Sequence, residues 1–242
     1  MKTALKILLV CLSFLILTNS CYSGEGESER YGKPAHEIRD VHNYYGIKAS
    51  SGIEVILTMG NSERVEIQAG DQIIQKVYTE VHNGVLEIGI KFGSWHNTSH
   101  ESIKAYVSAT QISSLNTSSA ANISSTNTIK GKNLKLDASS GSTIKIDLQE
   151  EAVQAETSSG ANMILTGTTQ NSNLEAASGS SIKSSELVSE YAKASASSGA
   201  EIHLLAKKSL VGEASSGGSV NYRGNPAQVE KNKSSGGSVE QE

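Results

Sequence analysis

Apolar and polar residues alternate along most of the second half of the chain, and a short turn element interrupts the alternation at regular intervals. Small or apolar side chains stand seven, five and three residues before each turn glycine, as in Leu134, Leu136 and Ala138. Others stand three and five residues after it, as in Ile144 and Ile146. A period of two predicts β-strands that bury one face. Each interval therefore predicts two short strands joined at a Ser-Ser-Gly or Ala-Ser-Gly turn.

The turn element recurs at intervals of 19, 19, 20, 18 and 19 residues. A unit this short cannot bury its apolar face alone, whereas stacked copies can. We therefore predict an all-β fold, a single-stranded right-handed parallel β-helix (solenoid) with coils of about 19 residues, the hand following from the general preference of β-strand crossovers. Glycine supplies the positive φ that such a turn requires, and the serines before it can bond the bend through ST-turns. The predicted turn glycines are Gly52, Gly141, Gly160, Gly179, Gly199, Gly217 and Gly236, with Ala120 in the same place between the first two.

Residues 37–115 carry larger apolar side chains and longer strand patterns than the rest of the chain. Alternating apolar residues predict strands around 65–67, 77–81, 86–90 and 103–107, and Asn83-Gly84 predicts a tight turn. We expect this part to form wider β-coils that cover the first edge of the solenoid. The regular coils then occupy residues 116–242.

The first 36 residues are typical of an exported protein. Residues 1–20 combine Lys2 and Lys6 with an apolar run and small residues before Cys21, which predicts a signal peptide. Cys21 stands where a bacterial lipoprotein carries its lipid anchor, and simple cleavage after Ser20 is the alternative. Residues 21–36 are polar and predict a flexible tether. We expect an outer-membrane lipoprotein or cell-surface protein, with the periplasmic face left open.

Composition poses the choice between a disordered chain and a repeat. Serine accounts for 39 of the 242 residues, 30 of them beyond position 100, against two Phe and one Trp. Such a composition is typical of disorder or of thin stacked layers, and the constant phase of the turns favours the layers. The net charge of −4 and the absence of a basic patch argue against a nucleic-acid partner.

The chain resembles a known family in three places. These are Ile47–Leu57 (IKASSGIEVIL) with Gly60, the Val65-Glu66-Ile67 strand, and the stretch Asn83–Ile88 (NGVLEI). Together with the phased turns that follow, they are similar to the head-GIN domain family of auto-transporter adhesins, over roughly residues 38–239. The resemblance implies a right-handed parallel β-helix, a role in adhesion or surface binding, and no catalytic residues.

One outward column of residues carries charge. Four residues before successive turn glycines stand Asp137, Glu156, Glu175, Ser195 and Glu213, which stacking would align about 4.8 Å apart. Aligned carboxylates attract cations, so the column predicts a possible ligand-binding or cation-binding edge. The alternative is a solvated face balanced by nearby lysines.

The sequence predicts no catalytic residues, no metal site and no cofactor. The turn serines lack a nucleophile elbow. Trp95, His96 and His100 lie in a polar segment with no third metal ligand evident. We therefore expect a non-catalytic envelope or surface protein that binds a glycan, a cell surface or a protein, with a homo-oligomer possible. A polysaccharide-active β-helix enzyme and a purely structural envelope lipoprotein are the alternatives.

Overall fold

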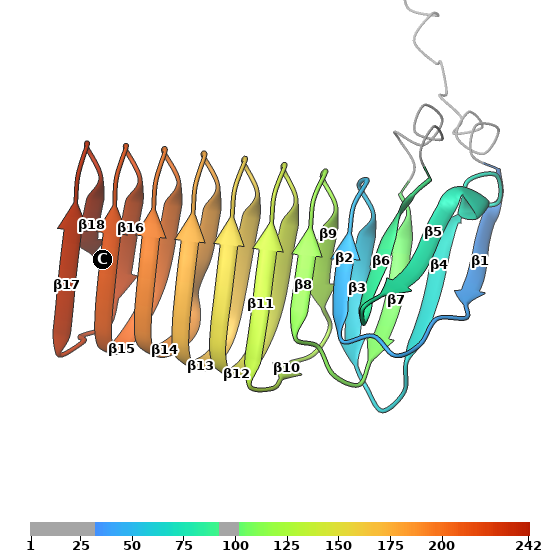
Figure 1. The fold of residues 1–242 in the computed structure, drawn as a ribbon, viewed down its shortest axis with the longest axis horizontal. Helices are drawn as coiled ribbons and strands as arrows, with labels where there is room; N and C mark the ends of the chain where they lie inside the picture. Colours follow the sequence, from blue (N-terminus) through green and yellow to red (C-terminus); the bar gives the residue numbers. More distant parts are fainter. Residues whose placement is uncertain (1–31, 92–101) are drawn as a thin grey trace, which may run out of the picture.

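From Ser114 onward the chain winds into stacked coils, as seen in the computed structural model, which describes residues 32–91 and 102–242 (Figure 1). Each coil has an entry wall, the strand that leads into a tight turn, and an exit wall, the strand that leaves it. Strands of successive coils pair in parallel one coil apart: Leu134 lies opposite Val153 on the entry wall, and Ile144 opposite Met163 on the exit wall. The prediction of a parallel β-solenoid with coils of about 19 residues is confirmed, and the solenoid has about seven turns.

The four longest strands each cross from the exit wall, around a bend opposite the tight turns, to the entry wall of the next coil. The bend thus forms a second edge of the solenoid, parallel to the ridge of tight turns (Figure 1). The solenoid strands are β8 (Ser114–Thr117), β9 (Asn122–Ser125), β10 (Ile129–Lys130), β11 (Asn133–Ala138), β12 (Thr143–Thr157), β13 (Asn162–Ala176), β14 (Ser181–Ala196), β15 (Glu201–Ala214), β16 (Ser219–Arg223), β17 (Gln228–Lys233) and β18 (Ser238–Gln241).

The tight turns have two residues at positive φ, whereas the sequence pattern indicates only the glycine. In the turn after β12, for example, Ser159 has φ 52° and Gly160 has φ 70°, and Ala161 N–H donates to the Ser158 carbonyl. Two positive φ values are typical of a type I′ turn. The Gly160 N–H also donates to the Ser178 carbonyl of the next coil at 3.2 Å. Backbone groups therefore link successive turns along the ridge.

The N-terminal part departs from coil geometry. Its first turn, at Gly52, joins the ridge directly, because Gly52 N–H donates to the Ser119 carbonyl at 2.9 Å. The residues between these two turns leave the solenoid and return. The strands of the whole N-terminal part are β1 (Pro34–Arg39), β2 (Gly46–Ala49), β3 (Glu54–Met59), β4 (Arg64–Gly70), β5 (Val77–His82), β6 (Val85–Ile90) and β7 (Lys104–Ala109), with the 3-10 helix η1 (Ile74–Lys76) before β5.

The prediction of wider β-coils over residues 37–115 is therefore wrong in part, because this region contains antiparallel strand pairs. Strands β6 and β7 extend the two walls in parallel beside β2 and β3, while β5, β4 and β1 add antiparallel strands outside them. The reason is connection length: the two-residue Asn83-Gly84 turn can join only antiparallel strands, whereas a parallel pair needs a long crossover. These strands lie at the N-terminal end of the stack (Figure 1).

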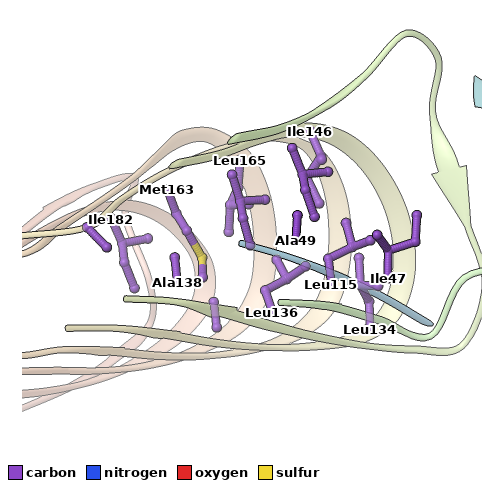
Figure 2. Close-up of a cluster of buried hydrophobic side chains, with 14 of the residues drawn as sticks. Ile47, Ala49, Leu115, Leu134, Leu136, Ala138, Ile146, Met163, Leu165 and Ile182 are labelled. Atoms are coloured by element: carbon purple, nitrogen blue, oxygen red, sulfur yellow. The ribbon is translucent and has the colours of Figure 1, made fainter. Parts of the chain in front are cut away.

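The interior is a thin apolar layer between the two walls. Side chains from neighbouring coils, such as Leu136, Ile146 and Leu165, meet there (Figure 2). These three are at most 2% exposed. Ala49 and Ala138 immediately precede tight turns, where the walls converge. The interior is filled by side chains, so a ligand has to bind on the outer surface.

Candidate functional site

The predicted column of carboxylates is aligned in the structure. On the outer side of the entry wall, Asp137 lies opposite Glu156, and Glu156 lies opposite Glu175. Ser195 follows, and Glu213 lies opposite it on β15. We call Asp137, Glu156, Glu175 and Glu213 the acidic column. A shallow hollow lies along its first three members.

Polar or basic neighbours, on the same strand or on the preceding one, contact Glu156, Glu175 and Glu213 of the acidic column. Gln154 Nε2 donates to Glu156 Oε1 at 2.7 Å, and Asn173 Nδ2 donates to Glu175 Oε1 at 3.1 Å. Lys193 Nζ lies 3.6 Å from Glu213 Oε1. The column is thus a run of repeated carboxylate and amide groups that can accept and donate hydrogen bonds.

The Asp137 carboxyl of the column has a raised pKa. Partial burial raises the pKa of its carboxyl, the Glu156 charge raises it further, and Lys135 opposes both effects. Within residues 32–91 and 102–242, no group of three His, Cys, Asp or Glu side chains is arranged to hold a metal ion.

Several predicted features lie outside the described residues. The signal peptide over 1–20, Cys21 and the segment with Trp95, His96 and His100 all belong to this group. Of the tether predicted for 21–36, only the last residues are described, and Pro34 begins strand β1.

The structure reveals a second surface feature that the sequence pattern did not indicate. A groove of about 1040 Å³ runs along the bend edge, opposite the tight turns, across β10 and the bends of β12 to β15. We call it the bend groove. Its lining includes Lys130, Gln149, Glu150, Glu151, Thr168, Thr169, Gln170, Glu190, Tyr191, Lys207 and Lys208.

The floor of the bend groove consists of inward-facing polar residues. Glu150 and Thr169 are in register on successive coils, and each is only 5% exposed. The sequence carries one usable signal, a polar residue nine positions after Gly141 and again after Gly160. The repeat pattern used above covers only the positions within seven residues before and five residues after each turn glycine, so it does not include this polar position.

Glu150 is the most perturbed acid described in the structure. Burial raises the pKa of its carboxyl to about 7, and the neighbouring Glu151 charge adds to the effect. Among the described residues, neither Oε1 nor Oε2 of Glu150 has a hydrogen-bond partner. Gly131 lies directly over the carboxyl, since a Cβ at that position would stand 3.0 Å from both oxygens.

A family model described as "Putative auto-transporter adhesin, head GIN domain" matches residues 43–226. The chain belongs to this family. The match runs from before β2 to just after β16, so it is shorter at both ends than the roughly 38–239 that the sequence resemblance predicted.

Solved structures with the same fold include proteins from Bacteroides and Parabacteroides species. A putative adhesin from Bacteroides fragilis superposes with a TM-score of 0.80 at 16% identity, covering 88% of this chain and 99% of that one. A putative adhesin from Parabacteroides merdae gives 0.67 at 18% identity, with 87% and 97% coverage. A structure called a putative lipid binding protein, from Parabacteroides distasonis, gives 0.64 at 16% identity with the same coverage. At these identities the likeness establishes the fold.

Sequence comparison with curated proteins gave no match. Within the part of the chain that the structure describes, no helix has the length and apolar character needed to cross a membrane. The family is one of adhesins by its description, which indicates an exported or cell-surface protein.

Proposed function

We propose that this protein is a non-catalytic binding protein of the cell envelope, and that it presents the outer face of its solenoid to a glycan, a cell surface or a surface protein. The observation that carries the proposal is the acidic column. Equivalent carboxylate and amide groups recur on β12 and β13 in register, with an ordinary strand spacing of about 4.8 Å. A regular array of this kind suits a ligand that itself repeats, because each unit meets the same donors and acceptors.

Two features argue against catalysis. The carboxylates of the acidic column repeat from coil to coil, whereas glycoside hydrolysis uses one pair at a defined separation. Glu150 has the raised pKa expected of a general acid, yet both of its oxygens are buried against Gly131 in this conformation, so they meet a bound molecule only after Gly131 moves.

Binding can be tested with the purified protein on glycan arrays and on intact bacterial and host cells. We expect a signal that the variant Asp137→Ala/Glu156→Ala/Glu175→Ala loses. The matched control Glu80→Ala/Glu87→Ala/Glu240→Ala removes the same charge from other surfaces and should bind normally. Equal binding by both triple variants would refute the role of the acidic column, and depolymerisation of any polysaccharide would favour the enzyme.

We also propose that Cys21 carries a lipid anchor at the outer membrane, with residues beyond it acting as a tether. The position of Cys21 directly after the predicted signal peptide supports this. Labelling cells with radioactive palmitate should mark the wild-type protein and leave Cys21→Ser unlabelled. Equal labelling of the two, or none in the wild type, would contradict the anchor.

A further inference from the structure

The bend groove is separate from the acidic column. It lies at the edge opposite the tight turns, where strands β12 to β15 pass from the exit wall to the entry wall. It crosses several coils, so it is elongated along the solenoid axis. An elongated groove fits a linear chain better than a compact small molecule.

The floor of the bend groove contains an unsatisfied acceptor. Glu150 is 5% exposed and its two carboxyl oxygens have no hydrogen-bond partner among the described residues. An unpaired buried polar group is costly, and a partner that donates to it recovers that cost. Gly131 packs against these two oxygens, and a side chain at this position would come within 3.0 Å of them. A small displacement of this residue would open the carboxyl to hydroxyl donors.

The walls of the bend groove combine amides, hydroxyls and charges of both signs. Gln149, Gln170 and Thr168 can donate and accept hydrogen bonds. The charged groups of the lining are three lysines and three glutamates: Lys130, Lys207 and Lys208, and Glu150, Glu151 and Glu190. Such a surface has no net preference for a polyanion or a polycation. Apart from Tyr191, Val188 is the apolar side chain of the lining, which leaves little for the side chains of a peptide.

Tyr191 gives the bend groove an aromatic platform. Its side chain is 48% exposed, the largest exposed fraction of any tyrosine described in the structure. The Lys208 ammonium lies 5.5 Å from the centre of its ring and 3.0 Å from Glu190 Oε2. This arrangement fixes the ring and leaves it available for packing against a ligand, since aromatic rings combine apolar faces with a polar tip.

We propose that the bend groove is a carbohydrate-binding site for a neutral oligosaccharide chain. Tyr191 packs against one sugar ring, Gln149 and Gln170 bond the hydroxyls of the chain, and Glu150 accepts from hydroxyls that reach the floor. The inference rests on the proposed function of surface binding, but it places a ligand on a different surface from the acidic column.

The test is isothermal titration of the protein with short neutral oligosaccharides of the manno, gluco and N-acetylglucosamine series. We expect at least one series to bind, with Tyr191→Ala weakening the affinity by about tenfold or more, equivalent to about 1.4 kcal/mol. Gln170→Ala should weaken it several-fold. The matched control is Tyr106→Ala, which removes another exposed tyrosine, on β7, and should bind like the wild type.

Each alternative result has a defined meaning. Failure of all three series to bind, or equal binding by Tyr191→Ala and Tyr106→Ala, would overturn the assignment of the bend groove. If only the acidic-column variant loses oligosaccharide binding, the bend groove is refuted and the proposed function stands. Binding of a peptide library that Tyr191→Ala abolishes would overturn the choice of carbohydrate.

Glu150 is tested by Glu150→Gln, which keeps the shape of the side chain and replaces one acceptor oxygen with an amide donor. We expect a several-fold loss of oligosaccharide affinity, with a native circular-dichroism spectrum and thermal midpoint at pH 5 as the check on folding. Unchanged affinity in a folded Glu150→Gln protein would remove Glu150 from the site.

Discussion

The hydroxyls of Thr157 and Ser180 lie 2.9 Å apart inside the solenoid, one coil from each other. Both side chains are buried, at 4% and 2% exposure. Thr117 and Ser142 repeat this pair at 2.9 Å two coils earlier. The coil between these two pairs has alanine at both equivalent positions, Ala138 and Ala161. The coil after them also has two alanines there, Ala176 and Ala200. Each pair of stacked positions therefore matches in polarity.

The buried hydroxyl pair predicts coupled energetics. Ser180 Oγ accepts from Ala177 N–H at 3.1 Å and also bonds the carbonyl of Thr157. Ser180→Ala should lower the free energy of unfolding by about 1–3 kcal/mol because it leaves these groups without a partner. Combined with Thr157→Ala, the loss should be smaller than the sum of the single effects by about 1 kcal/mol. Urea denaturation of the four proteins measures the coupling, and strict additivity would show that the hydroxyls act independently.

Two glycines near the turns should respond differently to alanine. Gly160 has φ 70° with open space around its Cβ position, and Ala120 already occupies an equivalent place at φ 60°. Gly160→Ala should cost about 1–2 kcal/mol from the left-handed backbone alone. At Gly218, a Cβ would stand 2.4 Å from the Ala196 carbonyl oxygen. Gly218→Ala should therefore cost about 3 kcal/mol, because backbone has to move. Thermal unfolding ranks the pair, and the opposite order would contradict the packing at Gly218.

Glu150 should make stability depend on pH in an unusual direction. Burial raises the pKa of its carboxyl from the ordinary 4.5 to about 7, so the folded protein holds this proton over a range in which the unfolded chain has lost it. The contribution of Glu150 to stability therefore falls as pH rises from about 4.5 to about 7 and is constant above that, with a total change on the order of 3 kcal/mol.

The variant Glu150→Gln separates this effect from other titrations. We expect its thermal midpoint to match the wild type near pH 5 and to exceed it above pH 7. Differential scanning calorimetry across this range measures the difference. A constant offset between the two proteins at every pH would contradict the raised pKa.

The C-terminal coil should resist end-to-end association because of two lysines. Lys231 and Lys233 are in register with the inward-facing Gly212 and Ala214, yet every residue of β17 is exposed. Lys231 Nζ lies 4.9 Å from the centre of the Tyr222 ring, over the end of the core. Charged side chains at such positions oppose pairing with another sheet edge.

Replacing both lysines should promote self-association of this protein. We expect Lys231→Val/Lys233→Val to form concentration-dependent oligomers in sedimentation experiments. The control Lys145→Val/Lys183→Val carries the same change on the outer side of internal coils and should sediment like the wild type. Identical behaviour of the two double variants would show that the terminal lysines have no special role.

The repeat allowed much of the fold to be predicted from the sequence. Because each coil repeats the contacts of its neighbours, the phase of residues such as Leu136, Ala155 and Leu174 around the turns is enough to assign the inward positions. The same phase is enough to align the acidic column, since its members stand at one fixed distance from the turn glycines. The Asn83-Gly84 turn was also predictable, because its geometry depends on two adjacent residues.

Other features required the tertiary structure, because they depend on contacts between positions that no local pattern relates. The direction of β4 follows from its antiparallel pairing with β1 and β7, and an alternating pattern of apolar residues is the same in parallel and antiparallel strands. The pairing of Thr157 with Ser180 depends on which side chains meet across a coil boundary.

The sequence by itself determined the coil, its period and its outward column, because these depend on residue type at fixed spacing. The bend groove was decided by the tertiary structure alone. Glu150 is an ordinary glutamate in the sequence, and only the stacking of the coil that contains Gly131 above it removes its carboxyl from water and leaves it without a partner among the described residues.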